Sequence, residues 1–579
     1  MRGYPGNLAP EPHGSEPNQG GLSLMASKLL VGCVSAGLAA LSSLTVALSH
    51  GAVHRHRPDA HHLHTATPIK HLVVIFQENV SFDHYFGTYP NAENPAGEPA
   101  FHARPGTPAI NGLDAALLHD NPNASNPVNG DGAVNPFRLD RSQAATADQD
   151  HNYLAEQVAF DGGKMDRFPF ATGSSGPPPG TDAPENTKGL VMGYYDGNTV
   201  TALWNYAQRF AMSDNAYGTT FGPSTPGAIN LISGQTNGVV EHLNGTGDET
   251  DDGHGGLTLI ADADPIGDAC SSPTRNQVRM GSRNIGDLLN MADVSWGWFE
   301  GGFDLTRSNA DGSTGCQRTT TSDVTHVTQA DYIPHHEPFQ YYASTANPEH
   351  VRPTSVHMIG RAGDAANHQY DTHDFFAAVR AGNFPAVTFL KAPAYQDGHA
   401  GYSDPLDEQA FVVKVLNFLQ KQPQWRNTAV VIAYDDSDGW YDHQRSPIVN
   451  ASRGDQDALD GEGVCGSGDI LPGVDPSTTH AMGRCGYGPR LPLLVISPWA
   501  RENYVDHAVL DQTSITRFIE DNWLHGQRIG QGSFDERAGS LMGLFDFRRP
   551  HMRRLFLDPQ TGLPVGPAAI RPPLHDAHG

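Results

Sequence analysis

The chain has few basic residues for its size. Its 579 residues contain 37 Lys and Arg against 64 Asp and Glu, which gives a formal net charge of −27. Nucleic acid is held by clustered positive charge, so this composition argues against a nucleic-acid partner. The 29 His are numerous, and mild acid would cancel much of the negative charge if they titrate near their reference value. The length suits one large α/β domain with insertions, or two domains.

Cysteine is also scarce. Of the five Cys, Cys33 lies in an apolar N-terminal segment, which leaves Cys270, Cys316, Cys465 and Cys485. No two of these four are close enough in sequence for a zinc knuckle. An even number in an exported chain predicts two disulfides, and four Cys allow three pairings. We favour Cys270–Cys316 with Cys465–Cys485, because this pairing closes the shorter loops.

An apolar run, LLVGCVSAGLAALSSLTVAL, occupies residues 29–48. A short basic start at Met25–Lys28 precedes it, and small residues fill its end, which is the pattern of a secretory signal. We therefore expect residues 1–52 to be an N-terminal extension with a signal peptide, and the mature protein to be exported to the periplasm or the medium. The alternative is an N-terminal membrane anchor, because about 20 apolar residues can span a bilayer.

Four apolar segments have the character of buried strands, and no internal repeat is visible. They are continuous rather than alternating, which is typical of a parallel sheet covered on both faces. These strand candidates are residues 71–76, 386–391, 428–434 and 491–498. Helical patterns occupy residues 199–210, 285–292, 407–422 and 511–524, the last with Asp511 as its expected N-cap. We predict an α/β fold with a central, mostly parallel sheet sandwiched by helices.

The remaining sequence suggests the domain boundaries. Residues 53–66 are rich in His and read as a solvated linker, although such a segment could also bind metal loosely. We expect the catalytic domain to span residues 67–550, with a C-terminal tail at 551–579. Residues 91–198 and 240–350 are dense in Gly, Pro, Asn and Asp, and we interpret them as long loop insertions over the sheet.

Two of the predicted strands end in acidic residues. Glu78 and Asn79 follow the first strand, and Asp435 and Asp436 follow the third. Ligands of open parallel sheets bind beyond the carboxyl ends of the strands, and a buried carboxylate is costly unless it is compensated. Separate solvent-facing carboxylates are the alternative, but the repeated pattern favours a shared site. An all-oxygen ligand set predicts one divalent ion of the Ca²⁺, Mg²⁺ or Mn²⁺ class.

Hydroxyl and imidazole side chains could complete such a site. Ser224, next to Thr225, stands in the turn GPSTPG before a helical segment that stops at Gly234. Free N–H groups at a helix start suit a phosphate, and a metal ion makes a nearby hydroxyl a nucleophile. The alternative is an ordinary helix cap. Protonated His could neutralise phosphate oxygens and supply a general acid, although most of the 29 must be structural or exposed. The candidates are His151, His335, His336 and His399, with the adjacent pair between prolines the stronger signal.

Several of these segments, in their order along the chain, resemble the bacterial phosphoesterase family. They are ENVSFDHYFG, GGKMDRF, GPSTPG with NLISG, YIPHHEPFQYY, AYDDSDGWYDH, GPRLPLLVISPWAR and VDHAVLDQTSITRFIEDNW. The family holds acid phosphatases and phosphatidylcholine-type phospholipases C within the alkaline-phosphatase-like superfamily. The resemblance covers about residues 67–550 and implies an alkaline-phosphatase-like fold.

The resemblance also implies roles for individual residues. Metal ligands are implied at Glu78, Asn79, Ser224, Asp435 and Asp436, with Ser224 as the nucleophile and His151, His335, His336 and His399 in the active site. The Asp-Asp pair resembles the acid phosphatase branch, since many relatives read Asp-Glu there. Relatives often have Pro-Asn-Arg where this chain has Pro226-Gly227-Ala228, which bears on substrate specificity.

We therefore expect an exported, metal-dependent phosphoric ester hydrolase of the acid phosphatase kind, acting through a phosphoserine. One alternative is a phospholipase C that cleaves phosphatidylcholine-type lipids, with transient contact with a membrane surface. The other is a non-catalytic exported binding protein of the same fold. The sequence leaves the choice of phosphate ester or phospholipid, and the oligomeric state, open.

Overall fold

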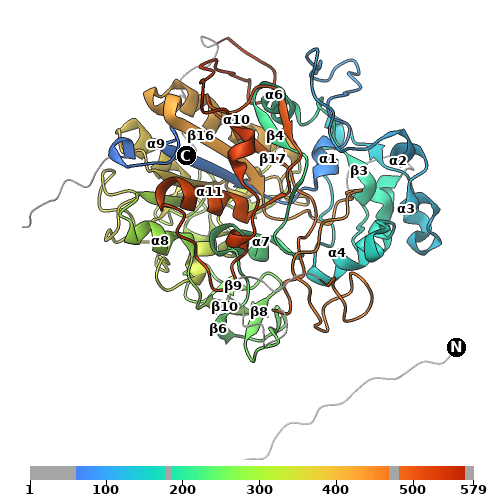
Figure 1. The fold of residues 1–579 in the computed structure, drawn as a ribbon, viewed down its shortest axis with the longest axis horizontal. Coiled ribbons are helices and arrows are strands. Elements are labelled where there is room, and N and C mark those ends of the chain that lie inside the picture. The colour runs from blue at the N-terminus through green and yellow to red at the C-terminus, as the bar shows by residue number, and fades with distance from the viewer. Residues whose placement is uncertain (1–59, 177–183, 468–480, 567–579) are drawn as a thin grey trace, which may run out of the picture. The chain divides into compact units, whose positions relative to one another are not determined.

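A large central sheet organises the chain (Figure 1). The computed structural model describes residues 60–176, 184–467 and 481–566. Within these residues, the central sheet has eight strands in the order β14-β11-β15-β1-β16-β17-β4-β18. All neighbouring pairs are parallel except those of β17, which is antiparallel to both β16 and β4. The predicted mostly parallel α/β fold is confirmed. In chain order the strands are β1 His71–Gln77, β4 Ala211–Ser213, β11 Trp296–Glu300, β14 Gln369–Asp371, β15 Val387–Lys391, β16 Thr428–Tyr434, β17 Leu493–Ile496 and β18 Tyr504–Asp506.

The two central strands explain why the apolar runs are continuous. Every residue of β1 and of β16 is buried. β1 pairs with β15 on one side and with β16 on the other, with His71 opposite Thr428 and Gln77 opposite Tyr434. Side chains of both faces therefore enter the core, and each buried Val, Leu or Ile contributes roughly 2 kcal/mol through lost contact with water.

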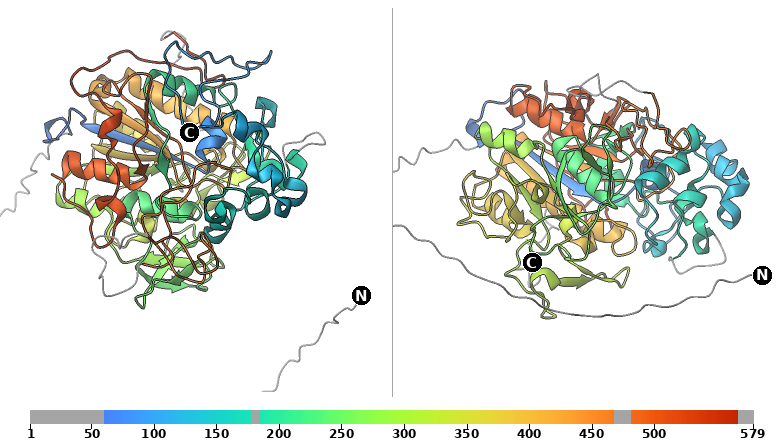
Figure 2. Two further views of the ribbon diagram at one scale, coloured as in Figure 1. Left: turned by 45° about the vertical axis from the view of Figure 1, so that its right-hand side comes forward. Right: turned by 90° about the horizontal axis from the view of Figure 1, so that it is seen from below.

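Helices cover both faces of the sheet (Figure 2). One group consists of α6 Thr201–Arg209, α9 Thr372–Arg380 and α10 Pro405–Lys421, where Phe376 of α9 packs edge-on against Phe418 of α10. The other consists of α7 Ser224–Ser233, α8 Ile285–Met291 and α11 Thr513–Trp523, where α7 contacts both α8 and α11. The four predicted helices and the helix after the GPSTPG turn are thus present.

The predicted start of the last helix was wrong by one residue. The N-cap of α11 is Gln512, and it makes no side-chain capping bond. Asp511 lies one position earlier, at the end of the short strand β19 Leu510–Asp511. Its carboxylate still accepts a hydrogen bond from the Thr513 N–H at 3.2 Å, so it satisfies a free donor of the first turn without being the cap.

One insertion was also misread. Residues 240–350 do not lie only over the sheet, because β11 within them is a fully buried strand of the central sheet. Its Trp-Gly-Trp-Phe-Glu sequence is short and stands among Gly- and Asp-rich segments, so it lacks the β-branched run that marked the other strands. The short strands β4, β14 and β18 were likewise not predicted.

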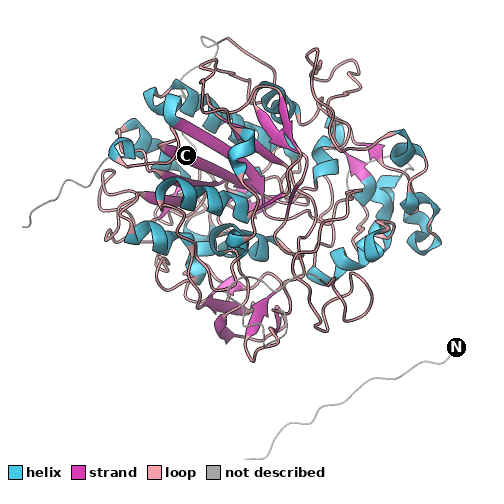
Figure 3. Ribbon diagram, viewed as in Figure 1, coloured by secondary structure: helices cyan, strands magenta, loops and turns pink. Residues whose placement is uncertain are grey.

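Long loops and short elements surround the sheet (Figure 3). Those that follow β1 include α1 Phe82–Phe86, α2 Ala115–His119, α3 Pro122–Ser125, α4 Tyr153–Phe160 and α5 Phe168–Ala171. Small separate sheets are formed by β2 Phe137–Arg138 with β3 Gly193–Tyr194, β5 Ala216–Tyr217 with β19, β6 Val239–Leu243 with β10 Gln277–Met280 and β9 Asp264–Pro265, β7 Glu249–Asp251 with β8 Leu257–Leu259, and β12 Thr319–Thr321 with β13 Thr328–Ala330.

Two disulfides connect loop segments. Cys270 is bonded to Cys316, with 5.3 Å between their Cα atoms, and Cys465 is bonded to Cys485, with 5.9 Å. The pairing that closes the shorter loops is confirmed. The predicted signal peptide and the first half of the His-rich segment lie outside the described residues, as does the end of the C-terminal tail. A search of the described part of the chain finds no helix with the length and apolar character needed to cross a bilayer.

Candidate active site

The acidic residues that follow β1 and β16 lie side by side. Because Gln77 and Tyr434 are paired at the ends of the two strands, Glu78-Asn79 and Asp435-Asp436 leave the sheet at the same edge. The backbone N–H of Asn79 donates to Asp435 Oδ1 at 3.2 Å. The sequence prediction that these two strand ends would converge agrees with the geometry.

Ser224 faces this acidic edge from the opposite side. It is the first residue of α7, and Pro223 is the N-cap. Its Oγ lies 3.0 Å from Glu78 Oε2, 3.2 Å from Asp436 Oδ2 and 3.4 Å from Asn79 Oδ1. Thr225 points elsewhere, since its Oγ1 donates to the His335 carbonyl at 3.3 Å.

Gly227 explains how α7 comes so close to the strand end. A Cβ placed on Gly227 would lie 2.1 Å from the Asp435 carbonyl oxygen. Any larger side chain would therefore push the helix start, and Ser224 with it, away from the carboxylates. Gly227, the second glycine of the GPSTPG turn, is therefore required for α7 to pack against the strand end.

The five residues predicted as metal ligands fit a hard divalent cation. Their side chains are buried, from 0% exposed for Glu78 to 3% for Asp436, and all can present oxygen, which such ions prefer. Asp435 Oδ2 is buried without a hydrogen-bond partner. One terminal atom of the Asn79 amide lies 2.7 Å from Glu78 Oε2 and 3.0 Å from Asp435 Oδ1. That atom is either a nitrogen donating to both or an oxygen that shares a cation with them.

Lys391, which the sequence analysis overlooked, also reaches this cluster. It is the last residue of β15, the strand next to β1. Its Nζ contacts Glu78 Oε1 and lies 3.5 Å from Asp435 Oδ2, and the residue is 1% exposed. A Lys at the carboxyl end of a continuous apolar strand was the available signal, because a buried ammonium requires negative partners.

His151 and His399 lie at the rim of the acidic cluster. The Nε2 atom of His151 is 3.4 Å from the Asn79 amide, and its Nδ1 is 3.2 Å from Asp438 Oδ1. Burial disfavours the imidazolium, but the carboxylates of Asp436, Asp438 and Asp148 outweigh it and hold the pKa of His151 well above its ordinary value. The two imidazole rings meet edge to face at 5.8 Å.

His399 and His336 are in a different electrostatic state from His151. Burial lowers the pKa of His399. Burial, aided by the neighbouring imidazoles, also lowers the pKa of His336 well below its ordinary value. His336 Nδ1 lies 3.3 Å from Glu78 Oε1 and 3.9 Å from Asp397 Oδ2. Both imidazoles therefore favour the neutral form, in which each offers one donor and one acceptor.

His335 is the outermost of the four predicted His. It lies with His336 in the single turn Pro334–His336, and the two rings are edge to face at 4.6 Å. Its Nδ1 is 3.6 Å from Asp264 Oδ1, and among the described residues neither a hydrogen bond nor an ion pair joins its ring to Ser224 or to the acidic cluster. The structure thus brings His151, His336 and His399 to the acidic cluster more directly than His335.

Glu156 is a second buried residue that sequence reasoning missed. It belongs to α4 and accepts hydrogen bonds from the Gly222 N–H at 2.9 Å and from Ser437 Oγ at 2.6 Å. It therefore connects the loop that carries Ser224 with the loop that carries Asp435 and Asp436. Burial, only partly offset by these donors, raises its pKa to about 7. Nothing in its sequence context distinguishes it from other helical Glu.

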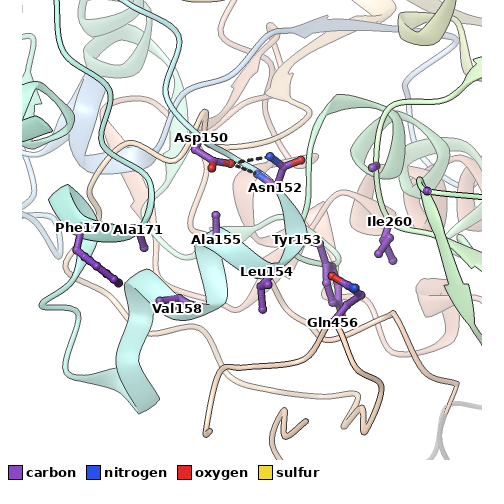
Figure 4. A pocket seen from close by; sticks show the side chains of 12 residues that line it. Asp150, Asn152, Tyr153, Leu154, Ala155, Val158, Phe170, Ala171, Ile260 and Gln456 are labelled. Atoms are coloured by element: carbon purple, nitrogen blue, oxygen red, sulfur yellow. Dashed lines mark hydrogen bonds between the residues drawn. The ribbon is translucent and has the colours of Figure 1, made fainter. Parts of the chain in front are cut away.

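Two hollows open beside the site. The first, about 340 Å³, is lined mainly by polar residues that include Asp148, His151 and Asp262, and by Pro223. The second, about 490 Å³, is lined by apolar parts of α4 and α5 and shares Asp150 and Asn152 with the first (Figure 4). In the second, Leu154 is 39% exposed and Phe170 47% exposed. A polar hollow next to Ser224 thus continues into a partly apolar one.

Comparison with known proteins decides the family. A model of the Phosphoesterase family matches residues 69–524. The chain belongs to this family. The relatives described below, which are named phospholipases C, agree with this membership. The resemblance seen in the sequence is confirmed.

Curated phosphoesterase relatives are distant in sequence. The chain is 26% identical to a non-hemolytic phospholipase C of Burkholderia pseudomallei, with 79% of this chain and 55% of that protein covered. It is 25% identical to a non-hemolytic phospholipase C of Pseudomonas aeruginosa, with 90% and 63% covered. It is 24% identical to phospholipase C A of Mycobacterium tuberculosis, with 78% and 72% covered. The chain thus spans little more than half the length of the first two relatives.

Solved structures that match are more distant still. They include a mutant of the alkaline phosphatase PafA, with 10% identity, a TM-score of 0.30, and 59% of this chain and 94% of that chain covered. Murine ectonucleotide pyrophosphatase/phosphodiesterase 5 matches with 11% identity, a TM-score of 0.27, and 60% and 95% covered.

Proposed function

We propose that the protein is a metal-dependent, acid phosphatase-like phosphoric ester hydrolase with Ser224 as its nucleophile. The observation that carries this proposal is the position of Ser224 Oγ, at the start of α7 and within 3.4 Å of Glu78, Asn79 and Asp436. Ser224 is not the helix cap, because the N-cap of α7 is Pro223, and the hydrogen bonds of its Oγ run to the acidic residues.

One divalent cation would be held by Glu78, Asn79, Asp435, Asp436 and Ser224. When bound, it supplies positive charge that favours the ionised serine and the charged phosphoryl oxygens. The all-oxygen set and its burial support an ion of the Ca²⁺, Mg²⁺ or Mn²⁺ class.

The protein groups then divide the reaction between them. Ser224 would pass its proton to a carboxylate that it donates to, Glu78 or Asp436. Its Oγ attacks phosphorus, the P–O bond to serine forms, and the P–O bond to the leaving alcohol breaks as that oxygen takes a proton. The Ser224 N–H at the start of α7 would face a phosphoryl oxygen, since the first turn of a helix has no internal acceptor for it. The Thr225 N–H already donates to Asp262 Oδ1 at 2.9 Å, and Pro226 has no N–H. Water then attacks the phosphoserine, which releases phosphate and restores Ser224.

His151 is the group best suited to protonate the leaving oxygen. Its raised pKa favours the imidazolium, whereas burial lowers the pKa of His336 and His399 and favours their neutral forms. It also lines the polar hollow through which an ester would approach Ser224. In this arrangement His336 and His399 donate hydrogen bonds to the substrate or to the acidic residues. His335 acts through its neighbours, because its ring packs against His336 and its carbonyl accepts from Thr225 Oγ1.

A second candidate function is phospholipase C activity, and one specific observation favours it. The partly apolar hollow with exposed Leu154 and Phe170 adjoins the polar hollow of His151. An apolar alcohol such as diacylglycerol fits this surface, whereas a small phosphomonoester needs only the polar hollow. The curated relatives named above are phospholipases C.

A substrate panel separates the two candidates. Release of phosphate from phosphomonoesters is measured beside release of phosphocholine from phosphatidylcholine, across mildly acidic to neutral pH. The double variant Leu154→Ser with Phe170→Ser should leave phosphomonoester turnover unchanged. If phospholipase activity dominates and falls selectively in this variant, the second candidate is correct. If neither substrate is turned over by the wild type, both are wrong, and the non-catalytic binding protein remains.

Export is part of the same proposal. The apolar run at residues 29–48 supports a signal peptide, and two disulfides suit an oxidising compartment. N-terminal sequencing of the protein recovered from its native host tests this. A mature start near Ala52 would support export, and an intact N-terminus in the membrane fraction would indicate an anchor.

A further inference from the structure

Lys391 places a fixed positive charge inside the acidic cluster. The ammonium contacts Glu78 Oε1 and is 3.5 Å from Asp435 Oδ2. It also lowers the pKa of Asp397, although burial keeps that carboxyl well above its ordinary pKa. Among the described residues, no other Lys or Arg lies within ion-pair distance of Glu78 or Asp435.

The carboxylates around Lys391 need compensation whether or not a metal ion is bound. Glu78 and Asp397 are 0% exposed, and Asp435 is 2% exposed. Several buried like charges at such distances repel one another strongly. Removal of the partner of a buried charge typically costs 3–5 kcal/mol, because the charge left behind is uncompensated. The buried carboxylates at this sheet edge therefore require a nearby cation for the native structure to be stable.

We infer that Lys391 is an internal counter-cation, which lets the acidic centre fold without its divalent ion and weakens the binding of that ion. The inference rests on the metal ligands of the proposed function. The ammonium and the ion would share Glu78 and Asp435, so each lowers the affinity of the site for the other. Lys391 is thus a positioning residue for the acidic cluster, set at the end of β15, and it need not touch the substrate.

This role differs in a measurable way from that of an ordinary buried ion pair. If Lys391 only packs and pairs, its loss lowers stability by the same amount with and without divalent ion. If Lys391 and the ion compensate the same charges, removal of Lys391 lowers stability strongly without the ion, and binding of the ion restores most of that stability. The quantity that decides is therefore the ion-induced rise in melting temperature, compared between variants.

The test uses the full chain, freed of metal with a chelator and then titrated with MgCl₂, MnCl₂ or CaCl₂. Melting temperature and calorimetric ion binding are measured for wild type, Lys391→Met and Lys391→Arg. Met keeps the length of the side chain without the charge, and Arg keeps the charge. Lys414→Met, on the exposed side of α10, is the matched control for loss of a Lys.

We expect the metal-free Lys391→Met protein to melt several degrees below wild type, and saturating ion to restore most of the difference. Its ion affinity should rise at least roughly tenfold, as removal of a unit charge a few Å away predicts. Lys391→Arg and Lys414→Met should resemble wild type in affinity. If Lys391→Met refolds only when ion is supplied, the inference is supported.

An equal ion-induced rise in wild type and Lys391→Met, with unchanged affinity, would overturn the inference and leave the proposed function intact. Failure of Lys391→Met to fold both with and without ion would also contradict it, because the ion should replace the lost charge. If wild type binds none of the three ions, the proposed metal site fails instead.

Discussion

Glu78 Oε2 lies 3.0 Å from Ser224 Oγ, although 146 positions separate the two residues in the sequence. They meet because β1 ends at the same sheet edge at which α7 begins, and because Gly227 lets the helix touch the backbone of Asp435. A carboxylate, a hydroxyl and a helix start are thereby held together without water-exposed side chains.

Neutralising one acidic ligand should reduce the metal content of the protein. Glu78→Gln and Asp435→Asn each remove one negative charge from a site whose affinity depends on charge. Elemental analysis of the purified variants should show reduced metal content. We expect an affinity at least tenfold weaker, which corresponds to a loss of roughly 1.4 kcal/mol in binding free energy. The control is Asp374→Asn on α9, a buried carboxyl whose partners include Arg352 and the Asp371 N–H. Full occupancy in both ligand variants would exclude the proposed set.

The alkaline limit of activity should report on His151. Its pKa is raised, so the imidazolium is present below that pKa and is lost as the pH rises through it. Asp438→Asn removes one of the carboxylates that raise this pKa, so the fall in kcat/KM should move to lower pH. Asp150→Asn, whose carboxylate accepts from Asn152, should not move it. The measurement is kcat/KM for an alkyl phosphate against pH. An unmoved limit in Asp438→Asn would show that His151 is not the acid.

Glu156 should make stability depend on pH near neutrality. Burial raises its folded pKa to about 7, above the value of an exposed Glu. A raised pKa contributes stability below the unfolded pKa, and this contribution is lost as the pH rises through about 7. Glu156→Gln should therefore remove at most about 3 kcal/mol of this pH dependence. Denaturant unfolding between pH 4 and 8 measures it. Parallel pH profiles for wild type and variant would show that Glu156 does not titrate in this range.

The same residue should position Ser224. In the wild type, the Glu156 carboxylate accepts from the Gly222 N–H at 2.9 Å and from Ser437 Oγ at 2.6 Å. The amide of Glu156→Gln is a weaker acceptor for both hydrogen bonds. We expect a lower kcat with little change in KM, because the position of the nucleophile changes and the hollow does not. Ser437→Ala should lower kcat less, since it leaves the bond to Gly222. A rise in KM alone would contradict this role.

The Cys465–Cys485 disulfide should stabilise the folded chain. It closes a loop across a sequence separation of 20 residues, for which restriction of the unfolded chain predicts roughly 3 kcal/mol. The double variant Cys465→Ser with Cys485→Ser should lose about that much in denaturant unfolding, with activity at low temperature retained. The backbone N–H of Cys485 also donates to Tyr153 Oη on α4 at 2.8 Å. Loss of activity without loss of stability would contradict the prediction and would show that the disulfide positions α4 beside the active site.

The sequence was informative where one residue type implied one environment. Continuous apolar runs identified β1, β15, β16 and β17, because strands buried on both faces exclude polar residues. The acidic residues after β1 and β16 predicted a common site, because ligands of parallel sheets bind beyond the carboxyl ends of the strands. The GPSTPG turn indicated the start of α7, whereas the close approach that Gly227 allows became evident only in the structure.

Other features depend on partners far along the chain, which no local pattern reveals. Glu156 looks ordinary in sequence, and Lys391 is distinguished only by its place at the end of an apolar strand. Their roles follow from burial beside Ser437 and Glu78. β11 escaped prediction because its five residues gain their strand character from β14 and β15 on either side. The imidazoles could be named from sequence, but the contrast between cationic His151 and neutral His336 arises from which carboxylates lie nearby and how deeply each ring is buried.

Trapping of the phosphoserine tests the central claim most directly. Wild-type protein is mixed with a radiolabelled phosphate ester, quenched in acid during turnover, digested and analysed by mass spectrometry. The account predicts one phosphoryl group on the peptide that contains Ser224, lost in Ser224→Ala and retained in Thr225→Ala. Ser224→Ala should also lose turnover while keeping its fold, since only the attacking oxygen is removed. Turnover close to that of wild type in Ser224→Ala, or a label found on another residue, would contradict the account.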